Sequence, residues 1–244
     1  TGLVVLAVTL IIGFSVLMAR MPSWGATEAE AARALPGDEL LTSPIVSWTN
    51  ARTIEAPPDQ VWPWLAQMGD SRGAFYSFTF IEDRVGALTG AAEYAVDYTN
   101  ANALHPEWQN PQPGEEIIQG TLKWERIEPG SWLLATSTNP DVMGWTWIWQ
   151  IEPASGGNTR LVNRIRIQPA GVGESPILSF FVGNGAFVME QRMMNGTKAR
   201  AEGWSEPPYQ EMAEIVLWFL ALIAGVMAAV FFVSRKSWIA PLAL

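Results

Sequence analysis

The side chains that could perform acid–base chemistry are few in this sequence. His105 is its one histidine and it has no cysteine, which excludes multi-histidine and thiolate metal sites, disulfides and cysteine nucleophiles. His105 could act as a general base, but a loop histidine bonded to the backbone beside a proline is the favoured interpretation. The carboxylates of Glu82-Asp83 and of Glu115-Glu116 are neighbours in sequence, so they point apart on a helix or a strand. We therefore predict no catalytic residue, no metal ligand and no cofactor-binding residue.

A row of tryptophans offers a different chemistry, the binding of an apolar molecule. Trp145, Trp147 and Trp149 alternate along one segment and so share one face of a strand. They could be ordinary core packing or the lining of a ligand cavity. Asn163 is expected opposite Trp149 on the same face, where it would either orient a ligand or bond to backbone.

A hairpin must position this row. We predict strands over Trp145–Pro153 and Thr159–Gln168, joined by a glycine-containing turn. Pairing Ile151 with Leu161 places the tryptophans opposite Asn163 and two isoleucines. The other face then carries arginines and is partly charged.

A long helix is the expected partner of the aromatic face. Glu174–Gly203 repeats apolar residues at helical spacing, ending in Met189 and Met193. Ser175 is its expected N-cap, and its glycines 183 and 185 suggest that a large group packs close to them. The candidate ligand cavity consists of Trp145, Trp147, Trp149, Asn163, Phe187, Met189 and Met193.

The remaining pattern predicts an α+β fold. The expected order is a strand, two helices, further strands and then the long helix. The segments concerned are the strand Ile45–Ile54, the helices Gln60–Met68 and Phe75–Leu88, an irregular stretch Gly90–Gly114, and the strands Ile117–Gln119, Leu122–Ile127 and Trp132–Ser137.

Two uncharged apolar runs are predicted to cross a membrane. Gly2–Ala19 would span ~27 Å as a helix, which suits a bilayer; a cleaved signal peptide is the alternative. Ile215–Val233 is the second run, and Ala221, Gly225 and Ala228 within it would allow close packing with helices of other membrane subunits.

The flanking charges suggest an orientation in the membrane. Arg235 and Lys236 follow the second run and favour a cytoplasmic C-terminus, which would place the middle of the chain outside the cytoplasm. Arg20 after the first run argues in the opposite direction. The net charge of −9, with no basic stripe, argues against nucleic acid as a partner.

Several motifs together resemble the START-like SRPBCC superfamily, the helix-grip proteins that include polyketide cyclases and lipid-transfer domains. The resemblance covers about Pro44–Gly203 and is closest to a bacterial branch. It is carried by Ala56-Pro57-Pro58-Asp59-Gln60-Val61-Trp62-Pro63-Trp64-Leu65, Gln67-Met68-Gly69, Arg72-Gly73-Ala74-Phe75-Tyr76-Ser77, His105-Pro106-Glu107-Trp108-Gln109, and Phe187-Val188-Met189-Glu190-Gln191-Arg192-Met193-Met194.

The resemblance implies a curved sheet around the last helix, with an apolar cavity between them. Members bind sterols, lipids, polyketides and other hydrophobic molecules, and a few are cyclases or hydrolases. This sequence departs from the pattern by having an apolar run at each end and a longer stretch over Gly90–Ala103. Those runs put a freely diffusing carrier in doubt.

The sequence therefore predicts a two-span integral protein of the bacterial cytoplasmic membrane with an extracytoplasmic helix-grip domain. The expected function is non-catalytic binding of a lipid, isoprenoid or pigment. An accessory subunit of a photosynthetic or respiratory complex is the alternative, followed by a cyclase or hydrolase. The expected division is a first transmembrane helix 1–20, linker 21–43, START-like domain 44–204, juxtamembrane linker 205–214, second transmembrane helix 215–234 and tail 235–244.

Overall fold

The computed structural model describes residues 2–80, 99–169 and 176–234, without the side chains of residues 169 and 176–183. The chain divides into two compact units, one formed by Thr1–Met21 with Pro207–Leu244 and the other by Pro22–Glu206. The first unit contains the helices α1 (Gly2–Arg20) and α6 (Gln210–Val233), which contact each other. Both are exposed, and both are long and apolar enough to cross a membrane.

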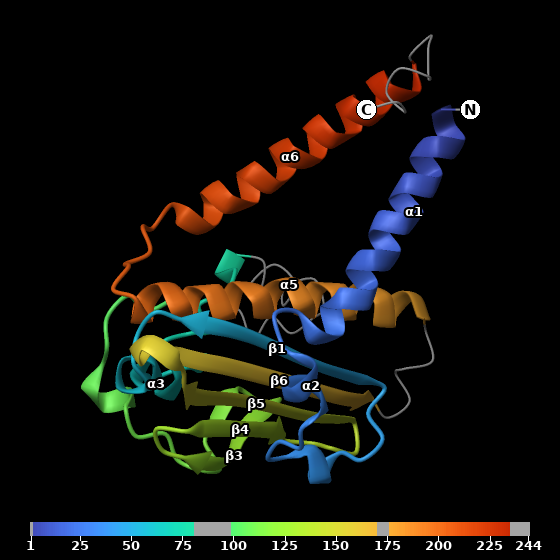
Figure 1. The fold of residues 1–244 in the computed structure, drawn as a ribbon. Coiled ribbons are helices and arrows are strands. Elements are labelled where there is room, and N and C mark those ends of the chain that lie inside the picture. The colour runs from blue at the N-terminus through green and yellow to red at the C-terminus, as the bar shows by residue number, and fades with distance from the viewer. Residues whose placement is uncertain (1, 81–98, 170–175, 235–244) are drawn as a thin grey trace. The chain divides into compact units, whose positions relative to one another are not determined.

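The second unit is α+β, with a six-stranded antiparallel sheet and a long helix (Figure 1). The strand order is β1-β6-β5-β4-β3-β2. The strands are β1 (Val46–Ile54), β2 (Glu116–Ile118), β3 (Leu122–Glu128), β4 (Trp132–Ser137), β5 (Met143–Pro153) and β6 (Thr159–Pro169). The helices are α2 (Glu28–Ala32), α3 (Pro58–Ala66) and α5 (Pro176–Ala201), with short 3-10 turns at Met21–Ser23, Asp38–Leu40, Pro106–Trp108 and Ser155–Gly157.

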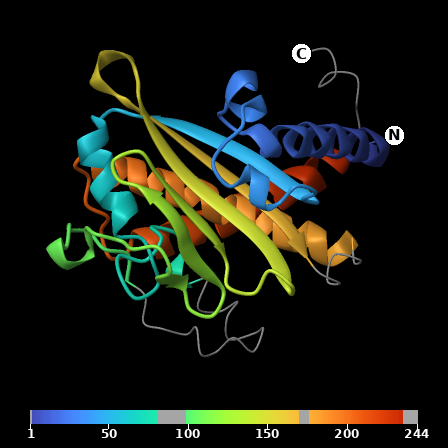
Figure 2. The same ribbon diagram turned by 90° about the horizontal axis from the view of Figure 1, so that it is seen from below.

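The long helix α5 runs along one face of the sheet. The strands curve around the helix, as the view from below shows (Figures 1 and 2). This is the helix-grip arrangement that the sequence predicted. We call the side of the sheet toward α5 the inner face. Trp147 and Trp149 of β5, Ile165 of β6 and Met193 and Met194 of α5 belong to one buried core.

The predicted hairpin register is confirmed. Ile151 pairs with Leu161, Trp149 with Asn163, Trp147 with Ile165 and Trp145 with Ile167. The alternation of apolar and polar residues fixes this register, because a slip by one residue would turn the tryptophans away from α5.

The predicted second helix is wrong at its start. Residues 75–78 are not helical, and Tyr76 and Ala74 have positive φ angles of 59° and 55°. Tyr76 is fully buried and its hydroxyl donates to the carbonyl of Trp64 at 2.8 Å, so tertiary packing decides the backbone here. Residues 79–80 are helical, and 81–88 lie outside the described residues, as do 90–98 and the expected N-cap Ser175.

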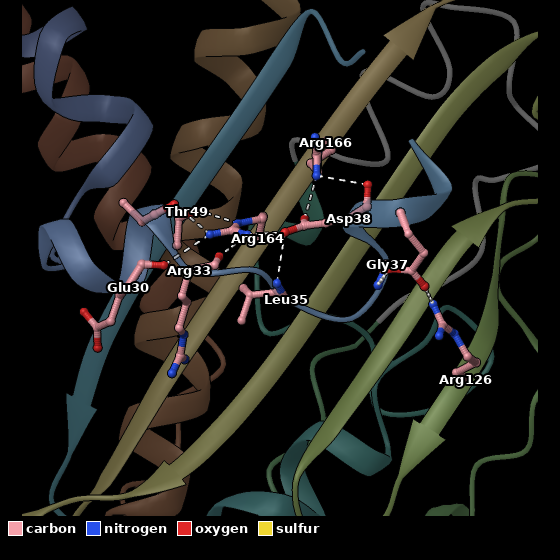
Figure 3. A network of polar contacts seen from close by, with 11 residues as sticks. Glu30, Arg33, Leu35, Gly37, Asp38, Thr49, Arg126, Arg164 and Arg166 are labelled. Atoms are coloured by element: carbon pink, nitrogen blue, oxygen red, sulfur yellow. Dashed lines mark hydrogen bonds and ion pairs between the residues drawn. The ribbon is translucent and has the colours of Figure 1, made fainter. Parts of the chain in front are cut away.

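The segment expected to be a linker packs on the outer face of the sheet, opposite α5. Its helix α2 carries a capping box, because Thr27 Oγ1 accepts from the N–H of Glu30 at 3.2 Å and Glu30 accepts from the N–H of Thr27 at 2.7 Å. Arg164 of β6 then closes the other end of this helix by donating to the carbonyls of Ala31 and Arg33 (Figure 3).

Arg164 is buried, yet all five of its N–H groups have acceptors. Besides the carbonyls of Ala31 and Arg33, it donates to the carbonyl of Glu30 at 3.1 Å, to Thr49 Oγ1 at 2.8 Å and to Asp38 Oδ2 at 2.6 Å (Figure 3). The charged outer face read from the sequence is therefore a docking surface for the preceding segment.

Candidate functional site

The tryptophans of β5 form a continuous aromatic row on the inner face. The ring centroids of Trp147 and Trp149 lie 5.2 Å apart in an edge-on arrangement, and those of Trp145 and Trp147 lie 6.2 Å apart. Phe75 tilts against Trp147 at 6.0 Å. Trp147 and Trp149 are buried, and Trp145 packs against the same core. Rigid aromatic side chains of this kind commonly line sites for apolar molecules.

Asn163 interrupts this apolar surface. It lies between Asn50 of β1 and Trp149 of β5, because the two registers pair it with both. The residue is 0 % exposed, and neither its amide oxygen nor its amide nitrogen has a hydrogen-bond partner among the described residues. The sequence allowed two roles for Asn163, a hydrogen bond to backbone or contact with a ligand. Among the described residues, its amide forms no hydrogen bond to backbone. Leaving such a group unpaired costs about 1–3 kcal/mol.

A second polar group comes from α5. Glu190 is 3 % exposed, and burial, offset in part by a hydrogen bond from Asn50, raises its pKa to about 8. Asn50 Nδ2 donates to Glu190 Oε2 at 2.7 Å, and Asn50 Oδ1 accepts from the backbone N–H of Trp24 at 3.1 Å. The Trp24 N–H fixes the Asn50 amide, so its donor side faces the carboxyl group. Glu190 Oε1 has no partner among the described residues.

Sequence reasoning missed Glu190, although a signal was present. The residue lies four positions after Ala186 and four before Met194, which places it within the buried side of the helix. A carboxylate at a core position of an amphipathic helix needs a partner or a proton, and that makes it a candidate for function.

The other predicted cavity residues divide into two groups. Met193 is buried in the same core as Trp147 and Trp149. Phe187 and Met189 are half-buried, and each has a different neighbour: Phe187 meets the Trp24 ring edge-on at 5.9 Å, and the Met189 carbonyl accepts from the Ser77 hydroxyl at 3.3 Å. The structure thus brings together the tryptophans, Asn163 and Met193.

The acid–base candidates of the sequence have structural roles where they are described. His105 is partly exposed and stacks on Trp108 with ring centroids 4.1 Å apart, and its backbone N–H donates to Gln67. Glu115 forms an ion pair with Arg72. Glu82-Asp83 lies outside the described residues, and within them no group of three or more His, Asp or Glu could hold a metal ion.

No family model matches the chain, and no curated protein matches it. Solved structures are similar to it at low identity. The protein MLL2253 from Mesorhizobium loti gives a TM-score of 0.36 at 14 % identity, over 64 % of this chain and 96 % of its own. TTHA0849 from Thermus thermophilus gives 0.36 at 15 %, over 64 % and 96 %. The di-domain ARO/CYC StfQ from the steffimycin biosynthetic pathway gives 0.38 at 13 %, over 67 % and 53 %.

Proposed function

We propose that this protein is a membrane-anchored, non-catalytic binding domain for a hydrophobic ligand such as a lipid, an isoprenoid or a pigment. The ligand lies between the inner face of the sheet and α5. The residues assigned to its site are Trp145, Trp147, Trp149, Asn163, Phe187, Met189 and Met193. The observation that carries the proposal is the aromatic row beside a buried, unpartnered amide.

The buried polar groups favour a bound molecule over ordinary packing. A core selected only for stability would place an apolar side chain at position 163, because an unpaired amide destabilises the fold. Ligand sites commonly combine an apolar lining with a few placed polar groups. A ligand that hydrogen-bonds to Asn163 would offset the cost of burying it.

The two apolar helices support anchoring in a bilayer. At about 1.5 Å per residue, α1 and α6 are ~28 Å and ~36 Å long, which matches or exceeds a hydrocarbon core. Arg235 and Lys236 follow the second helix, and by the positive-inside tendency they assign the C-terminus to the cytoplasm of a bacterium and the domain to the extracytoplasmic side.

The tethers between the helices and the sheet unit are short. Only Pro207, Pro208 and Tyr209 separate Glu206 from α6, and the 3-10 turn Met21–Ser23 directly follows α1. Short tethers keep the domain near the bilayer, so an apolar ligand would pass between lipid and protein with little exposure to water.

The test is the content of the purified protein. The full chain is purified in mild detergent, extracted with organic solvent and analysed by mass spectrometry. We expect one class of apolar molecule at a fixed ratio to protein, reduced in Trp147→Leu and retained in Trp204→Leu, an exposed control. Circular dichroism confirms that both variants fold. A wild-type protein without any enriched compound overturns the proposal.

An accessory subunit of a membrane complex is the second candidate. It is favoured by the small residues Ala221, Gly225 and Ala228, which are exposed in α6, and a Cβ built at Gly225 meets nothing within 4 Å. Another transmembrane helix could approach closely there. Native gels decide this: migration as a larger complex that Gly225→Leu disrupts supports it, and migration at the monomer mass contradicts it.

A further inference from the structure

We propose that Glu190 and Asn163 form the polar end of the ligand site and select a neutral molecule that carries a hydrogen-bond-accepting oxygen, such as a ketone, quinone or ester carbonyl. This inference rests on the proposed binding function and adds the chemical class of the ligand. Asn50 of β1 donates to Glu190 of α5 and pairs in register with Asn163 of β6, so the two groups approach the same interior from the helix and from the sheet.

Asn50 determines which atom of Glu190 is offered to a ligand. Its amide is held in one orientation by the backbone N–H of Trp24, so its N–H group donates to Oε2. The other oxygen, Oε1, has no partner in the described chain. With a pKa raised to about 8 by burial, the carboxyl group carries its proton at neutral pH. Because Oε2 already accepts a hydrogen bond, the proton belongs on Oε1, which then donates.

The unpartnered groups on this surface are mostly donors. Besides Glu190 Oε1–H, they are the two N–H bonds of the Asn163 amide and the indole N–H groups of Trp145, Trp147 and Trp149, none of which has an acceptor among the described residues. The Asn163 carbonyl is an unpartnered acceptor. A ligand that presents oxygen acceptors would satisfy this set, whereas a plain hydrocarbon would leave every member unpaired.

The surrounding charges favour a neutral ligand. The charged side chains on the adjoining elements are already engaged: Arg52 of β1 donates to Gln191 at 2.9 Å and to Asn195, and Arg192 of α5 pairs with Glu206. An anionic ligand would therefore find no spare arginine among these two. A cationic ligand would instead require Glu190 to ionise in an apolar interior.

The experiment compares three compounds of equal chain length: a long-chain methyl ketone, the alkane and the primary amine. Each compound is tested for its ability to displace the neutral fluorophore N-phenylnaphthylamine from the full chain in lipid nanodiscs. Partitioning of the compounds and the fluorophore into the lipid is the same for wild type and variants, so it cancels in the comparison. We expect the ketone to compete at roughly tenfold lower concentration than the alkane, the equivalent of one buried hydrogen bond or two.

Asn163→Leu is the decisive variant. Leucine has a similar volume and removes an unpaired amide, so the ligand-free variant should unfold at the wild-type temperature or above it. We expect the ketone's advantage to fall at least threefold while alkane binding is unchanged. Gln150→Leu, a polar-to-apolar change on the outer face of the neighbouring β5, is the matched control and should keep the full advantage.

Glu190→Gln tests the second donor. Glutamine stays neutral and retains an N–H donor, so the variant should prefer the ketone at every pH. In the wild type the preference should decline above pH about 8, where Glu190 loses its proton. An equal response of both proteins to pH would overturn the role of Glu190.

The possible failures are distinguishable. If the fluorophore does not bind the wild type, the proposed function fails. If it binds but ketone and alkane compete equally, the function stands and this inference fails. If the amine competes best, and more strongly as pH rises, the site recognises a cation through an ionised Glu190 and the inference is also wrong.

Discussion

At Glu190 and Asn163 the chain buries hydrogen-bonding groups that its own described residues do not satisfy. Natural cores rarely keep such groups without a use, because each lowers the free energy of unfolding. Asn50, by contrast, is buried and has both amide atoms paired. Asn50 has its hydrogen-bond partners, whereas Asn163 and Glu190 beside it lack them. We therefore take Asn163 and Glu190 as the candidates for ligand recognition.

Replacing Glu190 should change how stability depends on pH. In the fold its pKa is raised from 4.5 to about 8, so between these values the folded protein holds a proton that the unfolded chain has lost. The free energy of unfolding of the wild type therefore falls as pH rises through this window. Glu190→Gln removes this decline and should be more stable at pH 8 by about 1–3 kcal/mol. Thermal unfolding across the window measures both effects.

The exposed residue Glu128 supplies the control for this prediction. Glu128→Gln leaves the interior unchanged and should reproduce the wild-type decline with pH. Parallel curves for Glu190→Gln and wild type would show that Glu190 does not titrate as described.

At the scale of elements, two contacts hold the layers together. The helix α5 approaches the loop that follows α3 through Gly196, and the segment from α2 to Asp38 covers the outer face of the sheet (Figure 3). The glycine expected to permit close packing was Gly185, but a Cβ there meets nothing within 4 Å. The surroundings of Gly183, the other glycine, lie outside the described part of the chain.

Gly196→Ala should destabilise the domain. An alanine Cβ would lie 2.5 Å from the carbonyl oxygen of Tyr76 and 2.6 Å from its Cβ, and Tyr76 is buried with a fixed left-handed backbone. We expect a loss of roughly 1–3 kcal/mol, as for other overpacked cores. Gly185→Ala is the paired control and should gain up to about 1 kcal/mol through helix propensity. Denaturant unfolding of both variants tests this; a stable Gly196→Ala protein would refute the close contact.

Arg164→Lys should detach residues 22–41 from the outer face of the sheet. Lysine keeps the charge but cannot supply five planar donors to Thr49, Asp38 and the end of α2, so we expect a loss of about 2–4 kcal/mol. Arg126→Lys at the exposed pair with Glu39 is the matched control, with an expected change below about 0.5 kcal/mol. Limited proteolysis of residues 22–41 reports the detachment. Equal protection of both variants would count against the docking.

At the scale of the whole molecule, the strand pattern and the hairpin register could be read from the sequence because they depend on local alternation. The spacing of Trp145, Trp147 and Trp149 is enough to predict that they share one face of a strand. The outer docking could not be read in this way, since it depends on contacts between residues more than a hundred positions apart, such as Arg164 with Asp38. Three arginines on one face of β6, at positions 160, 164 and 166, were nevertheless a sign that this face is covered.

The prediction that a second helix starts at Phe75 was wrong for a related reason. The local composition suits a helix, but Tyr76 is held by Trp64 and by the cation of Arg200 4.5 Å from its ring. Likewise Glu190 was overlooked because its burial depends on how α5 turns toward β1. Periodicity predicts which elements form, whereas the polar contacts inside the site follow from how those elements meet.

If the proposed function is right, a bound molecule occupies the space between α5 and the tryptophan row. An experimental density map of the full chain, purified with its native lipids, tests it most directly. We predict continuous non-protein density against Trp147 and Trp149, with its polar end within hydrogen-bonding distance of Asn163. A map in which protein side chains fill this interior, and Asn163 finds a protein partner, would contradict the account.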